Sequence, residues 1–219
     1  MRREDDVDGQ YLWWPEGIVF PEVTDDHIGK QATYGVCYEP DLLTAMRERA
    51  VPGSLALDIG AHMGTHTIWL AAVCGCRVIS YEPVPELAAK LRANVSANHL
   101  EDRVQVVECA LSDHAGRGAM VNPGINSGQS RLVPQDDGSV NVATLDSFDW
   151  QDVALVKIDV EHHEMRVLAG GDETVKRCMP LLYVEGSKRK LDEWLLPRGY
   201  KRFGVYATTP VFGYERDAR

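Results

Sequence analysis

A glycine-containing turn between a predicted strand and a predicted helix is suited to hold a small cofactor. Residues 57–67 read Leu-Asp-Ile-Gly-Ala-His-Met-Gly-Thr-His-Thr. Glycine lets the backbone turn sharply and lets a ligand approach where a Cβ atom would collide. The dinucleotide fingerprint G-x-G-x-x-G needs glycine at the position of His62, so this turn disfavours a pyrophosphate.

Two carboxylates accompany the turn. Asp58 ends the first predicted strand, and Glu82 follows the second one within Tyr81-Glu82-Pro83. In doubly wound folds a carboxylate after the second strand binds the ribose hydroxyls. Asp58 suits a positively charged ligand and would repel a nucleotide phosphate. The turn and the carboxylates together predict an adenosyl cofactor without phosphate, and the alternative is a purely structural turn.

A second strand-like run, Ala154–Ile158, leads into five ionisable side chains. Residues 159–164 read Asp-Val-Glu-His-His-Glu. The carboxyl end of a parallel strand faces the ligand crevice in open α/β sheets. Because charged groups this close together are costly unless they are solvated or used, we interpret them as part of a functional site. The alternative is an acidic helix start favoured by the helix dipole.

The elements that must position these groups follow from the hydrophobic pattern. From Leu55 onward, short apolar runs alternate with segments of helical period, as expected for parallel strands with helices on both faces of the sheet. Strands are predicted at Leu55–Ile59, Arg77–Tyr81, Val104–Cys109, Ala154–Ile158, Leu181–Glu185, Lys201–Tyr206 and Val211–Tyr214. Helices are predicted at Pro40–Arg49, Gly64–Val73, Pro85–Asn98, His163–Ala169 and Lys188–Leu196.

The connections between the strands define the fold class. Helix-length crossovers or a long insertion separate the first five strands, whereas only Ala207–Pro210 joins the last two, which indicates a hairpin. We therefore predict an α/β fold with a doubly wound, seven-stranded, mostly parallel sheet and an antiparallel C-terminal hairpin. Residues 1–219 are predicted to form a single domain, with its core over 40–219.

Two segments lack a sustained period. Residues 1–39 are rich in aromatic side chains and are interpreted as an arm, which either packs on the domain or closes over a ligand as a lid. Residues 112–143 are rich in Gly, Ser, Asn and Asp and are predicted to be irregular. Within them, Asn122–Arg131 either hydrogen-bonds a sugar or polyol or forms a solvated surface loop.

Composition narrows the class of protein. The 219 residues carry a net charge of −10, which argues against nucleic acid as a partner because its binding needs clustered Lys and Arg. The five cysteines include no C-x-x-C pair and are predicted to be reduced. With no apolar stretch of the roughly 20 residues that a membrane span needs and no signal-peptide core, we expect a cytoplasmic protein without a membrane partner. The pattern is compatible with a monomer or an oligomer.

Five short blocks together resemble the FkbM family of methyltransferases. They are Asp58-Ile59-Gly60-Ala61-x-x-Gly64, Tyr81-Glu82-Pro83, Ala110-Leu111-Ser112-Asp113, Thr144-Leu145-Asp146 and Lys157-Ile158-Asp159-Val160-Glu161. The order and the spacing of these blocks also match the family pattern, and the resemblance covers residues 36–186. The resemblance implies a Rossmann-like methyltransferase fold, S-adenosylmethionine (SAM) as cofactor, and a small-molecule hydroxyl, on a sugar or natural product, as acceptor.

The resemblance also implies which residues contact the cofactor. It assigns contacts to Asp58, Gly60, Gly64 and Glu82, and an adenine contact near Cys109, Ala110 and Leu111. The predicted set is completed by Ala61, His62, Thr65, Pro83 and Asp159. Two residues depart from the family pattern: His162 replaces the glycine of Asp-Val-Glu-Gly-x-Glu, and His62 stands where asparagine is common. A side chain in place of glycine beside the crevice changes what the crevice accepts, so the acceptor cannot be transferred by analogy.

Methyl transfer to an alcohol is helped by a base, which is typically worth about 10²- to 10⁴-fold. We predict His162 or His163 in this role, and prefer His162, because Asp159 and Glu161 can orient an imidazole and stabilise its charged form. The predicted catalytic residues are therefore His162, His163 and Asp159, without a required metal. A variant hypothesis makes Asp159, Glu185 and a histidine the ligands of a divalent ion.

Two other classes of protein share the predicted fold. An NAD-linked oxidoreductase is disfavoured by the residue at position 62 and by the missing glycine spacing. A non-catalytic, adenosyl-binding subunit would show damaged motifs. The motif residues Asp58, Gly60, Gly64, Glu82 and Asp159 are all intact.

Overall fold

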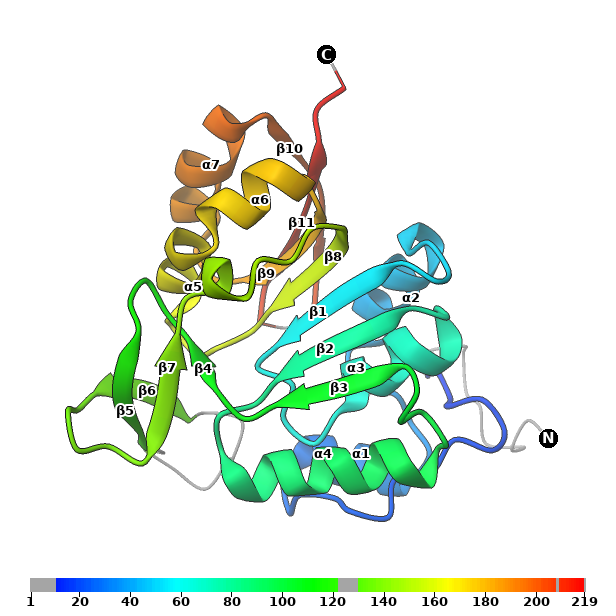
Figure 1. Cartoon of the computed structure of the whole chain (residues 1–219). Coiled ribbons are helices and arrows are strands. Elements are labelled where there is room, and N and C mark those ends of the chain that lie inside the picture. The colour runs from blue at the N-terminus through cyan, green and yellow to red at the C-terminus, as the bar shows by residue number, and fades with distance from the viewer. Residues whose placement is uncertain (1–10, 122–129, 208, 219) are drawn as a thin grey trace.

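The apolar runs of the sequence form one seven-stranded sheet in the computed structural model, which describes residues 11–121, 130–207 and 209–218. The strand order is β10-β11-β9-β8-β1-β2-β3 (Figure 1). The strands are β1 Leu55–Ile59, β2 Arg77–Tyr81, β3 Val104–Val107, β8 Val153–Ile158, β9 Leu181–Glu185, β10 Tyr200–Tyr206 and β11 Val211–Arg216. Each predicted strand is present, with ends that differ by two residues at most.

The pairing confirms the predicted topology. β1 pairs in parallel with β2 on one side and β8 on the other, and β3 and β9 extend the parallel sheet outward. β11 runs antiparallel to both β9 and β10, so the C-terminal hairpin reverses one edge. The chain fills one half of the sheet from β1 to β3 and the other half from β8, which places the ligand crevice of a doubly wound fold at the carboxyl ends of β1 and β8.

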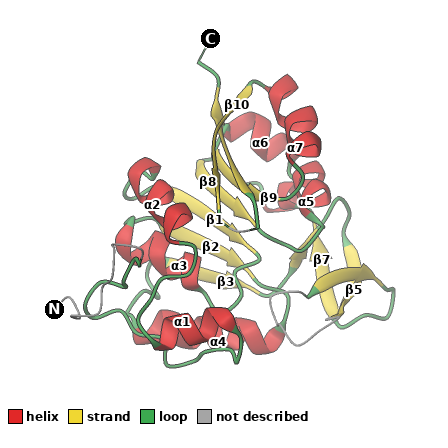
Figure 2. Ribbon diagram, turned by 180° about the vertical axis from the view of Figure 1, so that it is seen from behind, coloured by secondary structure: helices red, strands yellow, loops and turns green. Residues whose placement is uncertain are grey.

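Helices cover both faces of the sheet because side chains alternate along each strand. On β1, Ala56 packs with the helices of one face and Leu57 with those of the other. The first face carries α2 Pro40–Arg49, α3 Thr65–Ile68 with the π-helical turn η1 Trp69–Val73, and α4 Pro85–Ala97. The second carries α5 Glu164–Gly170, α6 Asp172–Cys178 and α7 Lys188–Leu195 (Figure 2). Two 3-10 turns, η3 Leu145–Phe148 and η4 Leu196–Arg198, are also present.

The described part of the N-terminal arm, residues 11–39, is packed on the domain and contains the helix α1 His27–Thr33. The Trp14 ring packs edge-on against Trp69 of η1, with 5.7 Å between the ring centroids. Asn94 of α4 fastens the arm by donating from Nδ2 to the Glu22 carbonyl (2.7 Å) and accepting from the Glu22 amide at Oδ1 (3.0 Å). Helix α1 was not expected from the sequence, because seven residues are too short to show a clear period.

The prediction that residues 112–143 are irregular is wrong for most of the described part of this segment. This segment contributes three strands to a four-stranded sheet with the order β4-β7-β5-β6. The strands of this sheet are β4 Ala110–Leu111, β5 Gly116–Val121, β6 Arg131–Pro134 and β7 Val140–Ala143. On β5, Gly118 is packed so closely that an added Cβ would lie 2.7 Å from the Leu132 side chain and 3.1 Å from the Val133 carbonyl. A glycine at this buried position weakens the alternating pattern of β5, and strands of two to six residues show little of such a pattern.

Two sequence expectations concern the remaining surface and core. Within the described ranges, no helix combines the length and the apolar character needed to cross a bilayer. All five cysteines have free thiols, and four of them are buried, which confirms their interpretation as reduced residues. Burial raises the pKa of the Cys37 and Cys74 thiols to about 12, so these thiols are protonated core groups.

Candidate functional site

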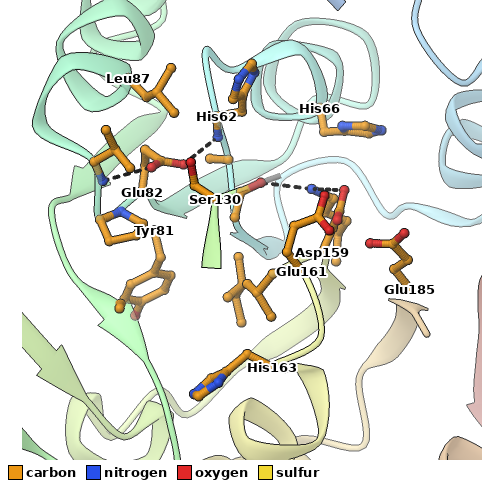
Figure 3. Close-up of a pocket in the computed structure, with 18 of the residues that line it drawn as sticks. His62, His66, Tyr81, Glu82, Leu87, Ser130, Asp159, Glu161, His163 and Glu185 are labelled. Atoms are coloured by element: carbon orange, nitrogen blue, oxygen red, sulfur yellow. Dashed lines mark hydrogen bonds and ion pairs between the residues drawn. The ribbon is translucent and has the colours of Figure 1, made fainter. Parts of the chain in front are cut away.

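A cavity opens at the carboxyl ends of β1, β2, β8 and β9, at the predicted crevice (Figure 3). Its wall is built from the turn after β1, the residues after β2, the end of β8, the N-terminal arm and the small sheet. Of the predicted cofactor and catalytic residues, the structure brings these to the wall: Gly60, Ala61, His62, Thr65, Glu82, Pro83, Cys109, Ala110, Leu111, Asp159 and His163. Asp58, Gly64 and His162 lie elsewhere.

The turn after β1 is held so tightly that only glycine fits at position 60. Gly60 has φ +81°, and an added Cβ would lie 1.9 Å from the Asp159 carbonyl oxygen. The amides of Gly60 and Ala61 both donate to the Tyr81 carbonyl, at 3.0 and 3.1 Å. The turn is therefore locked onto the ends of β2 and β8.

Glu82 is fixed beside this turn by two backbone donors. Its Oε2 accepts from the His62 amide at 2.8 Å, and its Oε1 accepts from the Val84 amide at 2.9 Å. The residue is only 4% exposed. Burial raises the pKa of Glu82 to about 7, although the two hydrogen bonds favour the charged form. A carboxyl group held in this way can bind the two hydroxyls of a ribose, and it would oppose a phosphate.

Apolar residues continue the wall from Glu82 towards the small sheet. Cys109, Ala110 and Leu111 lie here, as the resemblance implied for an adenine contact. Met120 of β5 and Leu132 of β6 line the same cavity and pack against the small apolar cluster that contains Ala110. The small sheet, which the sequence did not predict, thus supplies part of an apolar wall that suits an aromatic base.

Asp58 lies beneath the turn, fully buried, and acts on the site through its neighbours. It accepts from the Thr67 hydroxyl at 2.6 Å and pairs with the Lys157 ammonium at 3.5 Å. Lys157 Nζ in turn donates to the Gly60 carbonyl at 3.0 Å and lies 3.4 Å from Asp159 Oδ2. Lys157 lines the cavity and was missing from the predicted set, although it belongs to the quoted block at residues 157–161.

Gly64 has a packing role. It begins α3 with φ +97°, and an added Cβ would lie 2.3 Å from Cδ1 of Leu91 on α4. The second glycine of the motif therefore allows two helices to approach each other. The first glycine shapes the cavity.

Asp159 and Glu185 form a hydrogen-bonded pair of carboxyl groups at the ends of β8 and β9. Burial would raise the pKa of Asp159, but Lys157 and the hydrogen bond from Glu185 outweigh it and lower that pKa. Burial and the hydrogen bond to Asp159 raise the pKa of Glu185. At neutral pH the pair therefore holds one proton, with Asp159 ionised and Glu185 neutral.

The backbone directs the two adjacent histidines, His162 and His163, into different pockets. Glu161 and His162 have φ +50° and +71°, and this double left-handed turn puts His162 into a second pocket, beside Glu164 and Lys190. His163 lines the main cavity, where Figure 3 shows it below Glu161. The geometry therefore favours His163 over the preferred candidate His162.

His163 is oriented by a side chain from the segment after β4. Its Nε2 lies 2.9 Å from the Ser112 hydroxyl, so the hydroxyl fixes the plane of the ring. Burial and the nearby Arg166 guanidinium lower the pKa of His163. The imidazole is therefore neutral at pH 7, as a proton acceptor must be.

The arm and α3 contribute site residues that sequence reasoning missed: Tyr38, Glu39 and His66. A signal was present, because the tripeptide Tyr-Glu-Pro occurs at 38–40 as well as at 81–83. Ser130, at the end of the predicted polar loop, also lines the cavity. Residues 122–129 of that loop lie outside the described residues.

The metal variant gains no support from the geometry. Among the residues that the structure describes, no group of three or more His, Cys, Asp or Glu side chains is placed to hold a metal ion. The Asp159 carboxylate instead forms an ion pair with Lys157 and a hydrogen bond with Glu185.

Comparisons with known proteins agree with this geometry. The model of the methyltransferase FkbM domain matches residues 58–203. The chain is 28% identical to the 2-O-methyltransferase NoeI of Sinorhizobium fredii, over 67% of the chain and 68% of that protein. It is 26% identical to the hexuronic acid methyltransferase AglP of Haloferax volcanii, over 60% of the chain and 56% of that protein. The solved methyltransferase FkbM of Methylobacillus flagellatus shares the fold, with a TM-score of 0.55 at 16% identity, over 89% of the chain and 56% of that structure.

Proposed function

Because the chain belongs to the FkbM methyltransferase family, we propose that it binds SAM and transfers the methyl group to a hydroxyl oxygen of a sugar or a sugar-bearing natural product. One observation carries the proposal. The Glu82 carboxyl is held by two backbone amides beside a turn that has no room for a Cβ at Gly60, and apolar wall residues follow. This wall fits adenosine without phosphate.

The residues of the cavity also fit a cofactor that carries a positive charge. SAM supplies a methyl group that is activated by its sulfonium. Figure 3 shows Asp159 on the wall between Glu82 and Glu185. Because Asp159 is ionised, it favours a cation at that point. Lys157 holds Asp159 in place and also ties the Gly60 carbonyl, which keeps the turn and the carboxylate in fixed relation.

We propose that His163 accepts the proton that the acceptor hydroxyl loses. Methyl transfer is an in-line displacement, in which the protein mainly aligns the acceptor oxygen and forms no covalent bond itself. His163 lines the cavity on the same strand end as Asp159, and its lowered pKa leaves the imidazole free to take a proton. Ser112 orients its ring.

The sugar acceptor is supported by the relatives and by the wall. NoeI is described as a 2-O-methyltransferase and AglP as a hexuronic acid methyltransferase, so both names fit oxygen methylation of a sugar. The Glu161 carboxyl group lines the cavity near His163 (Figure 3), and carboxyl groups hydrogen-bond hydroxyls well. With a net charge of −10, the chain suits a small molecule better than a nucleic acid.

The test is direct. The protein is incubated with methyl-labelled SAM and a panel of free sugars, glycosylated natural products and phenols, and products are screened for a gain of about 14 mass units, the net mass of one methyl transfer. Calorimetry with SAM, S-adenosylhomocysteine (SAH) and NAD accompanies the screen. We expect SAM and SAH to bind and a sugar hydroxyl to be methylated. Binding of NAD alone would indicate an oxidoreductase, and binding of SAM without any methylated product would indicate a non-catalytic subunit.

A further inference from the structure

Glu39 and His66 form a buried polar pair on the cavity wall that the proposed chemistry leaves unused. Glu39 Oε2 and His66 Nε2 lie 3.2 Å apart, and their side chains are only 8% and 6% exposed. Neither atom has a hydrogen-bond partner of acceptable geometry within the part of the chain that the structure describes. Buried polar atoms nearly always have such partners, so this pair is suited to a ligand that brings its own polar groups.

The backbone at Glu39 is strained in a way that serves this placement. Glu39 has φ +54°, a left-handed conformation that is costly for a residue with a Cβ, and Pro40 begins α2 directly after it. Strain of this kind is often found at ligand sites, where the surrounding structure holds it in place. Leu42, Leu43 and Met46 anchor α2 in the core and thereby hold the Glu39 side chain at the cavity.

The position of the pair fits one end of the proposed cofactor. Figure 3 shows Glu82 on one side of the cavity and His66, with Asp159 and Glu185, on the other. If Glu82 binds the ribose, the sulfonium comes next towards Asp159, and the amino-acid end of the cofactor points beyond it. That end carries an ammonium, which has donors only, and a carboxylate, which has acceptors only.

We propose that Glu39 and His66 bind the α-amino-acid end of SAM, with the Glu39 carboxylate accepting from the ammonium and a ring N–H of His66 donating to the carboxylate. This inference rests on the proposed function. It assigns a role to the first Tyr-Glu-Pro tripeptide that parallels that of the second: each presents one glutamate to the cofactor, Glu39 from the start of α2 and Glu82 from the end of β2.

The experiment compares two ligands that differ only by this end of the molecule. SAH carries the amino-acid group, and 5′-methylthioadenosine keeps the adenosine and the sulfur without it. The Kd of each ligand is measured by calorimetry for the wild type, Glu39→Gln and His66→Gln. We expect the Kd of SAH to rise about 10- to 100-fold in Glu39→Gln, the range for a lost hydrogen bond to a charged group, and by less in His66→Gln. The Kd of 5′-methylthioadenosine should stay within twofold, which also shows that the pocket is folded.

Asp41→Asn is the matched control, because Asp41 lies on α2 two residues beyond Glu39 and is exposed. It should leave both Kd values unchanged. Equal weakening of both ligands in Glu39→Gln, or no weakening of either, would overturn the assignment. If SAH binding is unchanged while the KM of an amino-sugar acceptor rises, the ammonium belongs to the acceptor, and the assignment is likewise overturned. A wild-type protein that binds neither SAM nor SAH would instead refute the proposed function itself.

Discussion

The two sides of the cavity are built by different means. On the donor side, defined here as the turn at Gly60 with Glu82, backbone groups make the decisive contacts: two amides hold the Glu82 carboxyl, and two more tie the turn to Tyr81. On the strand-end side, defined as Asp159, His163 and Glu185, side chains make the decisive contacts. Lys157 pairs with Asp159, Ser112 contacts His163, and Glu185 is hydrogen-bonded to Asp159.

The difference explains why one side tolerates little variation and the other can diverge. Backbone contacts need a particular φ, and at Gly60 this requirement excludes every side chain. Side-chain contacts can be replaced when a neighbour changes in step. We therefore expect substitutions on the donor side to weaken binding of the cofactor, and substitutions on the strand-end side to change rate or acceptor with the cofactor still bound.

The largest effect should come from Gly60→Ala. The new Cβ would meet the Asp159 carbonyl at 1.9 Å, so both the turn and the end of β8 must shift. We expect SAH affinity, measured by calorimetry, to fall more than ~100-fold, and the free energy of unfolding in urea to fall by ~3 kcal/mol or more.

Gly53→Ala is the matched control for that substitution. Gly53 has a similar φ of +80°, but no atom lies within 4 Å of an added Cβ. It should cost ~1 kcal/mol of stability from backbone strain alone and leave SAH affinity unchanged. Equal loss of affinity in both variants would contradict the steric account of the donor side.

The next effect tests the strand-end side through the adjacent histidines. His163→Gln should lower kcat ~100-fold on the methylated acceptor because the proton acceptor is lost, whereas SAH affinity should stay within about twofold. His162→Gln, one residue away but in the second pocket, should leave kcat within about twofold. Because burial lowers the pKa of His163, the activity of the wild type should persist below pH 6.5, the ordinary histidine value. Similar kcat values in the two variants would remove His163 from the reaction.

Glu82→Gln should give a smaller effect on binding together with a change in the pH dependence of stability. The glutamine amide keeps one acceptor but places an N–H group against a backbone amide, so SAH affinity should fall ~10-fold. The raised pKa means that folding favours protonated Glu82. Its contribution to stability is therefore fully present below pH 4.5 and is lost as the pH rises to about 7.

Urea unfolding at pH 4.5 and pH 7.5 measures this contribution. Between these values the wild type should lose ~1–3 kcal/mol more stability than Glu82→Gln, which has no carboxyl to ionise at this position. Glu86→Gln, at an exposed position on α4, should behave like the wild type. A parallel pH dependence in the wild type and Glu82→Gln would show that the Glu82 pKa is not raised.

The donor side could be predicted from the sequence because its contacts are local. Gly60 and Glu82 each follow directly on a short, mostly apolar strand, and the register of β1 with β2 brings Ile59 beside Tyr81. The same reasoning placed Asp58 in the site, whereas the structure buries it. Alternation along β1 turns this side chain away from the cavity, towards Thr67 and Lys157.

The strand-end side depended on features that the sequence does not display. Two consecutive positive φ angles decide that His163 and not His162 lines the main cavity, and they occur at residues with ordinary side chains. Two further wall residues outside both sides, Glu39 and Leu132, come from the arm and the small sheet, whose pairings are short or distant in sequence. Hydrophobic period therefore predicted the main sheet well and these contributors poorly.

The smallest effect should come from His162→Gly, which tests whether the strand-end turn is strained. At φ +71° the histidine pays a conformational cost that glycine avoids, although glycine loses more entropy on folding. We expect a net gain of ~0.5–1 kcal/mol in the free energy of unfolding, with kcat within about twofold because the side chain lies outside the main cavity. His99→Gly, at an exposed residue with φ +55° after α4, should give a similar gain. A loss of stability in His162→Gly alone would mean that contacts in the second pocket outweigh the strain, and a loss of kcat would mean that the turn itself aligns His163 with the acceptor.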